Sequence, residues 1–230
     1  MISEKEAMIQ RHSVRNYLDK KIEEDKIALI QEKIGELNKE GSLNIHFSED
    51  AGKTFRSFLS RMSGLGSAPS AIICSGADSD DLEQRVGYYG EKLVLYIQQL
   101  GLNTCWVGMF SRKQAEKLMP AENGERTVIA IAVGYGETQG KARKTKSFED
   151  VTEVFGDADG AKGAEQAPDW FREGVEAALL APTAMNQQKF TICLNKDGSV
   201  ELIDNGGVFS RVDLGIVKYH FELGSGHKAL

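Results

Sequence analysis

The sequence has 230 residues, of which 41% are hydrophobic and 27% charged, and its formal net charge is −6. This length suits one large domain or two small ones sharing a core, and the composition excludes disorder of the whole chain. The negative charge excludes a general nucleic-acid surface. No stretch approaches the roughly 20 apolar residues of a membrane helix, so no membrane contact is expected. The mixed charges of residues 4–6 make a secretory signal unexpected. Three widely spaced cysteines favour a reducing, cytoplasmic location.

The first 140 residues carry clear helical and strand patterns. Ser3 and Glu6 have the spacing of a capping box, which predicts a short helix over Ser3–Gln10. Apolar residues recur at intervals of three and four in the longer helical segments, and short apolar runs predict strands. The expected helices are Glu23–Asn38, Asp80–Leu100 and Arg112–Met119, and the expected strands are Leu43–Phe47, Ala71–Cys74 and a central one at Thr127–Val133.

The remaining chain divides into a region of weak pattern and an ordered end. Gly134–Ala167 is rich in glycine and basic residues and is interpreted as a long surface crossing. Order resumes with a helix at Pro168–Leu180, strands at Thr191–Leu194 and Val200–Ile203, and a helix at Val208–Leu223. We therefore expect an N-terminal half (1–140), a crossing segment (141–167) and a C-terminal half (168–230) that completes the same domain.

A short internal similarity links the two halves. Arg85-Val86-Gly87 stands near the start of one predicted helix, and Arg211-Val212-Asp213 near the start of another. Each follows a strand-like segment. Two matching halves would indicate a duplication, although a single short match is slender support.

The first candidate site is the pentapeptide Arg11-His12-Ser13-Val14-Arg15, which is interpreted as a compact polar turn. Two guanidinium groups flank a hydroxyl there. Arginine binds phosphate through paired hydrogen bonds and keeps its charge, and serine adds a further donor. The pattern suits a phosphate site, and the alternative is a solvated turn.

The second candidate is the polar loop from Ala181 to Phe190. Two of its carboxamides, Asn186 and Gln188, offer donors and acceptors that suit the edge of a heteroaromatic ring. A plain hydrogen-bonded connection is the alternative. The third candidate is Gly101–Gly108, whose terminal glycines allow a ligand to approach the backbone closely. Within it, Trp106 also suits a core position, and Cys105 suits a buried and unreactive one.

Other chemistries find no matching pattern. The segment Gly134-Tyr135-Gly136 follows a strand, but Gln139 stands where a dinucleotide fingerprint needs its third glycine, and no helical stripe follows. The four histidines show no metal-ligand spacing, and neither a Gly-x-Ser-x-Gly elbow nor a Walker loop is present. We therefore predict no metal site and no dedicated catalytic acid or base.

Taken together, the candidate segments resemble the nitroreductase superfamily of FMN enzymes. Four stretches across most of the chain carry this resemblance, each weak alone. The R-R/H-S-x-R opening corresponds to Arg11, His12, Ser13 and Arg15, and the A-P-S-x-x-N-x-Q loop to Ala181, Pro182, Thr183, Asn186 and Gln188. The G-L-x-T-C-W-V-G segment corresponds to Gly101, Leu102, Thr104, Cys105, Trp106, Val107 and Gly108, and the V-G-Y strand end with its basic segment to Val133, Gly134, Tyr135, Lys141 and Arg143.

The sequence departs from the usual family pattern in two ways. Lys189 and Phe190 stand where Pro and Trp are usual, which puts flavin binding in doubt. The loop at Ala181–Phe190 also comes near the C-terminus instead of following the opening helices. That order looks like the smaller branch named for a thermophile nitroreductase. Ordinary members are homodimers whose FMN lies between chains, so a chain holding both halves could be a monomeric pseudo-dimer with one FMN site. A homodimer is the alternative.

The resemblance implies an α+β nitroreductase-like fold, with an antiparallel or mixed sheet flanked by helices. It also implies FMN as cofactor, NADH or NADPH as co-substrate, and a small organic acceptor such as a nitroaromatic, a quinone or a flavin. Arg11, Ser13 and Arg15 would hold the phosphate, with His12 nearby and Lys141 or Arg143 adding charge. Pro182, Thr183, Asn186 and Gln188 would contact the ring or ribityl chain, and backbone at Trp106, Val107 and Gly108 would lie by the ring.

Three alternatives to this function stay open. The chain could keep the fold and bind a small ligand or regulate without redox turnover. It could use the same flavin for flavin reduction, dehalogenation or dehydrogenation. It could also be an α+β interaction protein in which residues 11–15 form only a surface turn.

Overall fold

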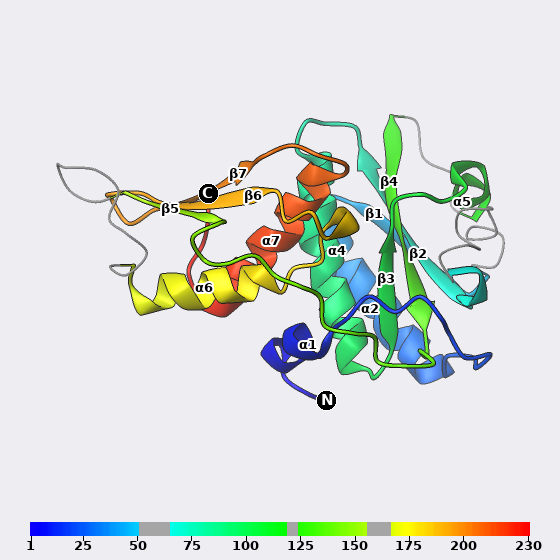
Figure 1. Cartoon of the computed structure of the whole chain (residues 1–230). Coiled ribbons are helices and arrows are strands. Elements are labelled where there is room, and N and C mark those ends of the chain that lie inside the picture. Colours follow the sequence, from blue (N-terminus) through cyan, green and yellow to red (C-terminus); the bar gives the residue numbers. More distant parts are fainter. Residues whose placement is uncertain (51–64, 119–123, 156–166) are drawn as a thin grey trace. The chain divides into compact units, whose positions relative to one another are not determined.

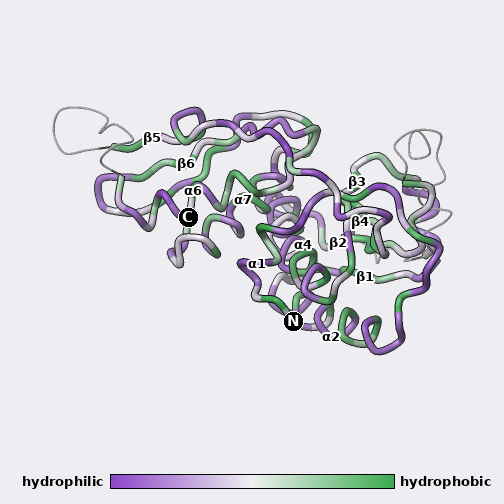
Figure 2. Tube along the Cα trace, turned by 60° about the horizontal axis from the view of Figure 1, so that its bottom comes forward, coloured by the Kyte–Doolittle hydropathy of each residue, from purple (hydrophilic) through white to green (hydrophobic). Residues whose placement is uncertain are grey.

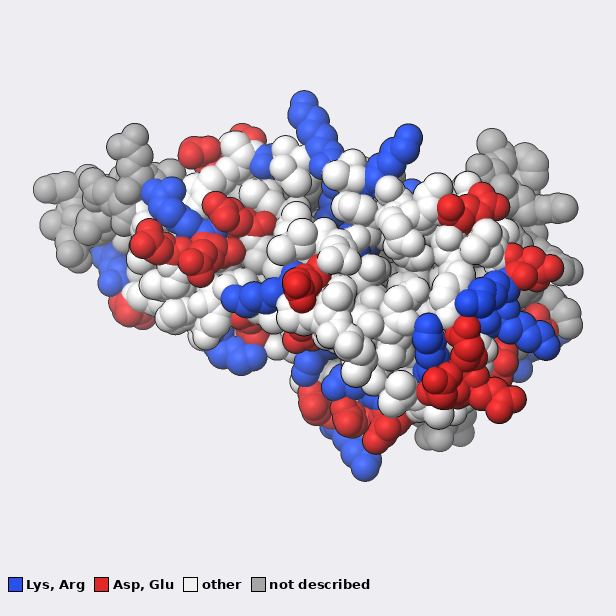
Figure 3. Space-filling view, turned by 90° about the horizontal axis from the view of Figure 1, so that it is seen from below, with Lys and Arg blue, Asp and Glu red and all other residues white. Residues whose placement is uncertain are grey.

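A computed structural model describes residues 1–50, 65–118, 124–155 and 167–230, and it divides the chain into two compact units. The first unit is Met1–Ala142 and the second is Arg143–Leu230 (Figure 1). Within the described ranges, no helix is both long and apolar enough to cross a membrane. On the face shown in Figure 3, acidic and basic side chains lie near one another in groups, with wide uncharged areas between the groups.

The first unit is built on a four-stranded antiparallel sheet in the order β1-β2-β4-β3. Its strands are β1 (Asn44–Ser48), β2 (Ser70–Ala77), β3 (Asn103–Val107) and β4 (Glu125–Gly134), and its helices are α1 (Glu4–Gln10), α2 (Glu24–Gly41), α4 (Leu82–Gln99) and α5 (Arg112–Leu118), with a 3-10 turn η1 (Leu65–Ser67). The capping box at Ser3 and Glu6 is confirmed. Of the predicted helix Arg112–Met119, Met119 lies outside the described residues.

Strand β4 lies inside the sheet, between β2 and β3, as its apolar run predicts. Most of its residues are buried because both faces of the sheet are covered. On one face, Ala130 and Ala132 of β4 and Ile73 of β2 belong to a core with Val14 and Tyr17. The other face meets the long helices, where Trp106 of β3 packs so closely on α4 that a Cβ at Gly90 would lie 2.5 Å from its ring. Figure 2 shows hydrophobic and hydrophilic residues mixed along α2, as expected for a helix with one buried side.

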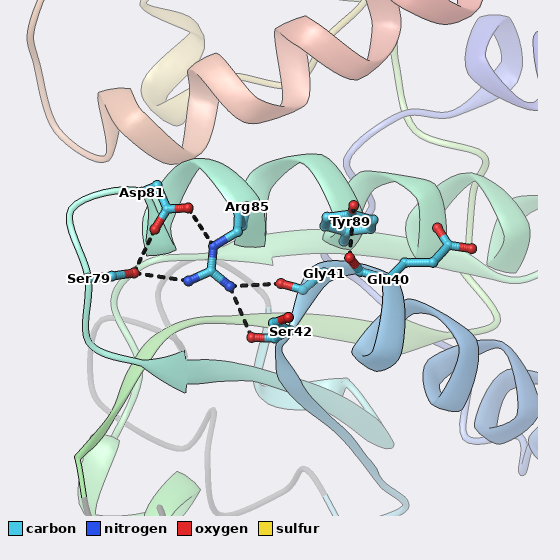
Figure 4. Close-up of polar contacts among 7 residues, drawn as sticks. All are labelled: Glu40, Gly41, Ser42, Ser79, Asp81, Arg85 and Tyr89. Carbon is cyan, nitrogen blue, oxygen red and sulfur yellow. Dashed lines mark hydrogen bonds and ion pairs between the residues drawn. The ribbon is translucent and has the colours of Figure 1, made fainter.

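Arg85 of α4 fastens the corner where α2 ends and β1 begins (Figure 4). Its guanidinium donates to the carbonyl oxygens of Gly41 and Ser42 at 2.7 and 2.9 Å, and to Asp81 and Ser79 at 2.9 Å each. Helix ends leave carbonyl groups without intrahelical partners, and Arg85 supplies donors for them. Gly41 is the last residue of α2, and Ser42 after it takes the left-handed conformation.

The second unit contains a three-stranded sheet, β5-β6-β7, and two packed helices. Its elements are β5 (Thr152–Val154), α6 (Asp169–Leu179), a 3-10 turn η3 (Ala184–Asn186), β6 (Phe190–Leu194), β7 (Val200–Asp204) and α7 (Ser210–Ser225). The β6–β7 hairpin turns at Gly198, which has a φ of 85°. The crossing segment holds β5, which the sequence analysis missed, and its residues 156–166 lie outside the described ranges. That 168–230 completes one domain with the N-terminal half stays a prediction.

Helices α6 and α7 meet through glycines, which leads to a prediction for Gly224→Ala. A Cβ at Gly224 would lie 2.3 Å from the Cβ of Ala177 and 2.8 Å from the carbonyl oxygen of Glu173. We expect the free energy of unfolding to fall by about 1–3 kcal/mol, because an added methyl group must push two backbones apart. Urea denaturation measures the change. The matched control is Gly35→Ala in α2, where a Cβ meets nothing within 4 Å, and which should stabilise by up to about 1 kcal/mol. Equal effects of the two substitutions would contradict the packing argument.

Candidate functional site

The segment that follows α1 is extended instead of forming the compact turn that the sequence analysis predicts. Ser13 bridges Thr104 in parallel, and the amide of Val14 donates to the carbonyl of Thr104 at 3.0 Å. Tyr17 forms a second bridge to Gly136. Strand β3 stands at the edge of the described sheet, so the carbonyl of Thr104 is open to accept the bond from Val14. The extended backbone holds residues 11–17 against the end of the sheet.

Three of the predicted phosphate-binding residues line one pocket in the first unit. Ser13, Arg15 and Lys141 line it together with Val14, Asn16, Glu137, Thr138 and Gly140, and its volume is about 250 Å³. Sites for drug-sized ligands usually measure about 300–1,000 Å³. The pocket therefore suits a phosphate-bearing end of a ligand better than a whole flavin. Glu137 also lines this pocket, and its negative charge would repel an anion bound there.

The loop after β4 supplies the other side of this pocket, and its glycines are needed for close packing. Gly140 has a φ of 79°, and a Cβ there would lie 2.7 Å from the Cβ of His12. Asn103 holds the same loop by accepting from the amide of Gly136 and donating to Gln139, both at 3.0 Å. His12 thus packs beside the pocket without appearing among its lining residues. Residues 134–142 form no helix, in agreement with the rejection of a dinucleotide fingerprint.

Arg11 is buried beside the carboxylate of Glu91, away from solvent. Its guanidinium is 1% exposed, its Nε lies 3.6 Å from Glu91 Oε1, and its three nitrogens have no hydrogen-bond partner among the described residues. Glu91 also accepts a 2.8 Å hydrogen bond from the indole of Trp106. Burial lowers the pKa of Arg11, and the neighbouring Glu91 opposes that shift. Glu91 thus supplies the negative charge next to Arg11, and Arg11 does not line the pocket of Ser13 and Arg15. Its predicted contact with the phosphate stays a prediction.

The remaining predicted residues of β3 have structural roles in the first unit. The Trp106 side chain is turned toward Gly90 and Glu91 of α4. Val107 belongs to the core on the other face, and Gly108 follows the end of the strand. Cys105 is buried, and burial raises the pKa of its thiol, which suits an unreactive cysteine. Contact of this backbone with a flavin ring stays a prediction.

In the second unit, the loop at 181–190 has an unusual backbone. Met185, Asn186 and Gln188 are left-handed, with φ of 53°, 55° and 46°, and Met185 is 91% exposed. Gln188 is buried. Its side-chain Oε1 accepts from the backbone amide of Lys146, and its Nε2 donates to the carbonyl of Lys144. Its backbone amide donates to Thr183 Oγ1. Asn186 Nδ2 also donates to the carbonyl of Lys144 at 2.9 Å. Pro182 is buried, so much of this predicted ring-binding group serves the loop itself.

Arg143 belongs to the second unit and does not line the pocket of Ser13 and Lys141. Its guanidinium donates to the carbonyl of Leu180 at the end of α6. Of the two basic residues predicted to add charge at the phosphate, only Lys141 lines the pocket.

The two residues that depart from the family pattern lie at the start of β6. Lys189 is exposed, whereas Phe190, the first residue of the strand, is 2% exposed and contributes to the core.

Two buried carboxylates at these segments escaped the sequence analysis. Glu91 lies among the buried residues of α4, on the same side as Gly87 and Val94. An acidic residue on the buried side of a helix usually has a charged partner, so its position in the sequence could have indicated one. Asp213 of α7 accepts from the amide of Ala184 and from Gln187 in the second unit. The only sequence signal for Asp213 was its place in the short internal similarity, which says nothing of its partners.

Residues 4–225 of the chain match the model of a family described as "Putative TM nitroreductase". The chain belongs to this nitroreductase family. The match runs through both units. The solved structure of a "putative nitroreductase" from Thermotoga maritima is similar to the chain with a TM-score of 0.65 and 25% identity, over 97% of this chain and 83% of that chain. The α+β nitroreductase-like fold predicted from the sequence is confirmed.

Two further solved structures share the nitroreductase fold at lower identity. A nitroreductase family protein from Streptococcus pneumoniae has a TM-score of 0.52 and 12% identity, over 65% of this chain and 98% of that chain. A protein from Bacteroides thetaiotaomicron described as "Putative NADH dehydrogenase/NAD(P)H nitroreductase" has a TM-score of 0.50 and 18% identity, over 66% and 96%. A comparison with curated proteins found no match.

Proposed function

We propose that this nitroreductase-family chain is an FMN-dependent oxidoreductase that uses NADH or NADPH to reduce a small organic acceptor. The pocket of Ser13, Arg15 and Lys141 is the observation that carries the proposal. It gathers a hydroxyl and two cations from segments more than 120 residues apart, at the positions where the family resemblance places the phosphate. Nitroaromatics, quinones and free flavins are the acceptor classes we propose, with the chain acting as a monomer in the cytoplasm.

The residues of the first unit fit the phosphate end of FMN. Arg15 and Lys141 would supply charge, and Ser13 would donate a hydrogen bond. Arg11 does not line this pocket and lies beside Glu91, so its contact with the phosphate is proposed from the family resemblance alone. Contact of Asn186 and Gln188 with the ring or ribityl chain is proposed from the family resemblance alone. Bound FMN would supply the redox chemistry by accepting hydride and passing reducing equivalents on, while the protein orients the reactants.

The first test is a visible absorption spectrum of the purified chain before and after FMN is added. We expect flavin bands that shift on binding and bleach with NADH or NADPH in the absence of oxygen. A protein that is colourless and leaves the FMN spectrum unchanged on titration would contradict the proposal. That outcome would favour a family member that works without redox turnover.

The pocket makes a sharper prediction for single substitutions. Arg15→Ala or Lys141→Ala should weaken FMN binding about 10- to 150-fold, because a hydrogen bond to a charged group contributes about 1.5–3 kcal/mol. Glu137→Gln should instead tighten binding, since it removes a negative charge from the same pocket. Quenching of FMN fluorescence measures all three. Lys39→Ala, at an exposed position in the last turn of α2, is the control for a lost positive charge. Equal affinities for Arg15→Ala, Lys141→Ala and this control would place the phosphate elsewhere.

A further inference from the structure

In the second unit, the carboxylate of Asp213 closes the loop at residues 183–188. Both of its oxygens accept from the amide of Ala184, at 2.9 and 3.0 Å. Oδ2 also accepts a 2.9 Å hydrogen bond from Gln187 Nε2, whose amide group donates to the carbonyl of Val208 at 2.8 Å as well. Asp213 lies in the first turn of α7 and is 8% exposed. A single buried carboxylate therefore fastens the loop at two points.

The loop needs such a fastening because its backbone is strained. Met185, Asn186 and Gln188 hold left-handed conformations that residues with a Cβ rarely adopt. Strained conformations persist only when surrounding contacts enforce them. The bonds to Asp213 start from Ala184 and Gln187, which enclose Met185 and Asn186. Gly207 also leaves room for the Gln187 amide group, because a Cβ there would lie 2.4 Å from Oε1.

We infer that Asp213 is a positioning residue for the 183–188 loop and that the charge on its carboxylate sets how often this loop opens. The importance of the loop for FMN rests on the proposed function, whereas its opening does not. Opening would carry Ala184 and Gln187 away from the carboxylate and return Asp213 to water. Closed and open loops would then differ in the environment of one ionisable group.

The direction of the pH effect follows from the burial of Asp213. Burial raises the pKa of its carboxyl from 3.8 to about 6, against the opposing hydrogen bonds from Gln187 and Ala184. Among neighbouring charges, Asp204 raises this pKa and Arg143 lowers it. An open loop would restore the ordinary pKa, so the charged form favours opening and the protonated form favours closure. Opening should become more frequent as the pH rises from about 4 to 6 and should level off above that.

Hydrogen–deuterium exchange at the amide of Ala184, corrected for intrinsic rates, tests the inference on the chain without FMN. Between pH 4 and pH 7 we expect protection to fall by up to about a hundredfold, since two pKa units correspond to a factor of about one hundred. Asp213→Asn should remove this pH dependence. Asp204→Asn, the matched control, should retain it over a narrower pH range, because it removes a charge that raises the pKa of Asp213. Constant protection in the wild type, or the same pH dependence in Asp213→Asn, would overturn the inference.

A parallel FMN titration keeps this inference distinct from the proposed function. pH-dependent protection that Asp213→Asn removes would support the role of Asp213 even if the protein ignored FMN at every pH, and only the flavin proposal would then fail. Conversely, tight FMN binding together with pH-independent protection of Ala184 would support the flavin proposal and overturn the role of Asp213.

Discussion

Replacing Glu91 by Ala should lower the free energy of unfolding of the first unit by about 3–5 kcal/mol. The substitution leaves the Arg11 guanidinium, which is 1% exposed, without the carboxylate beside it. A buried charge that loses its partner is among the most destabilising changes a protein can suffer. It also deprives the Trp106 indole of its hydrogen-bond acceptor. Urea denaturation followed by circular dichroism measures the loss.

Two further variants separate charge from packing at this pair. Glu91→Gln keeps an acceptor for Trp106 but removes the negative charge, so it should also destabilise, by less than Glu91→Ala. Arg11→Met combined with Glu91→Leu replaces the buried pair by apolar side chains of similar size and should recover much of the lost stability. A loss below about 1 kcal/mol for Glu91→Ala would show that Arg11 does not depend on this carboxylate.

In the second unit, Phe171→Ala should lower the free energy of unfolding by about 3–5 kcal/mol. Phe171 is fully buried in α6 and makes edge contacts with Phe148 and Phe221, with ring centroids 6.0 and 5.8 Å away. Truncating a buried aromatic ring loses its transfer free energy and leaves a cavity. Because Phe148 belongs to the segment before β5, that segment should lose protection against hydrogen exchange as well.

The location of the tryptophans helps to measure this effect on the second unit alone. The chain has two, Trp106 in the first unit and Trp170 beside Phe171 in the second. In a Trp106→Phe background, fluorescence during urea denaturation follows Trp170. Phe171→Leu fills more of the space and should cost less than the alanine variant. If the two variants were equally stable, the packing around Phe171 would not be the source of the loss.

The sequence predicted most helices and strands because their patterns are local. The apolar spacing of α2 and α4 reflects burial on one side, and the run in β4 reflects burial on both. Strand β5 was missed because it has three residues and depends on pairing with β6, which lies about 40 residues later. The extended form of residues 11–17 likewise depends on the outer edge of β3, which no local pattern reveals.

The candidate site was predicted in part, for a comparable reason. Residue types identified Ser13 and Arg15, the family resemblance added Lys141, and these three residues line one pocket. The burial of Arg11 was not expected, since its partner Glu91 lies 80 residues away in sequence. The left-handed backbone of Met185, Asn186 and Gln188 could not be predicted from the sequence either, because contacts with Asp213 and with residues 144–146 enforce it. Residue chemistry can be read from the sequence, but long-range partners decide which groups stay free for a ligand.

The outer strand of the second sheet has an edge to which a strand of another molecule could add. Strand β7 stands at an edge of β5-β6-β7, where unpaired backbone groups could add a strand from another molecule. The amide of Leu230 donates to the carbonyl of Val200 at 2.8 Å, so the chain's own end occupies part of that edge. Farther along, Glu201 is exposed and Asp204 is partly exposed, and such charges discourage strand addition. One backbone hydrogen bond at one end and two acidic side chains farther along therefore make strand addition at this edge less favourable.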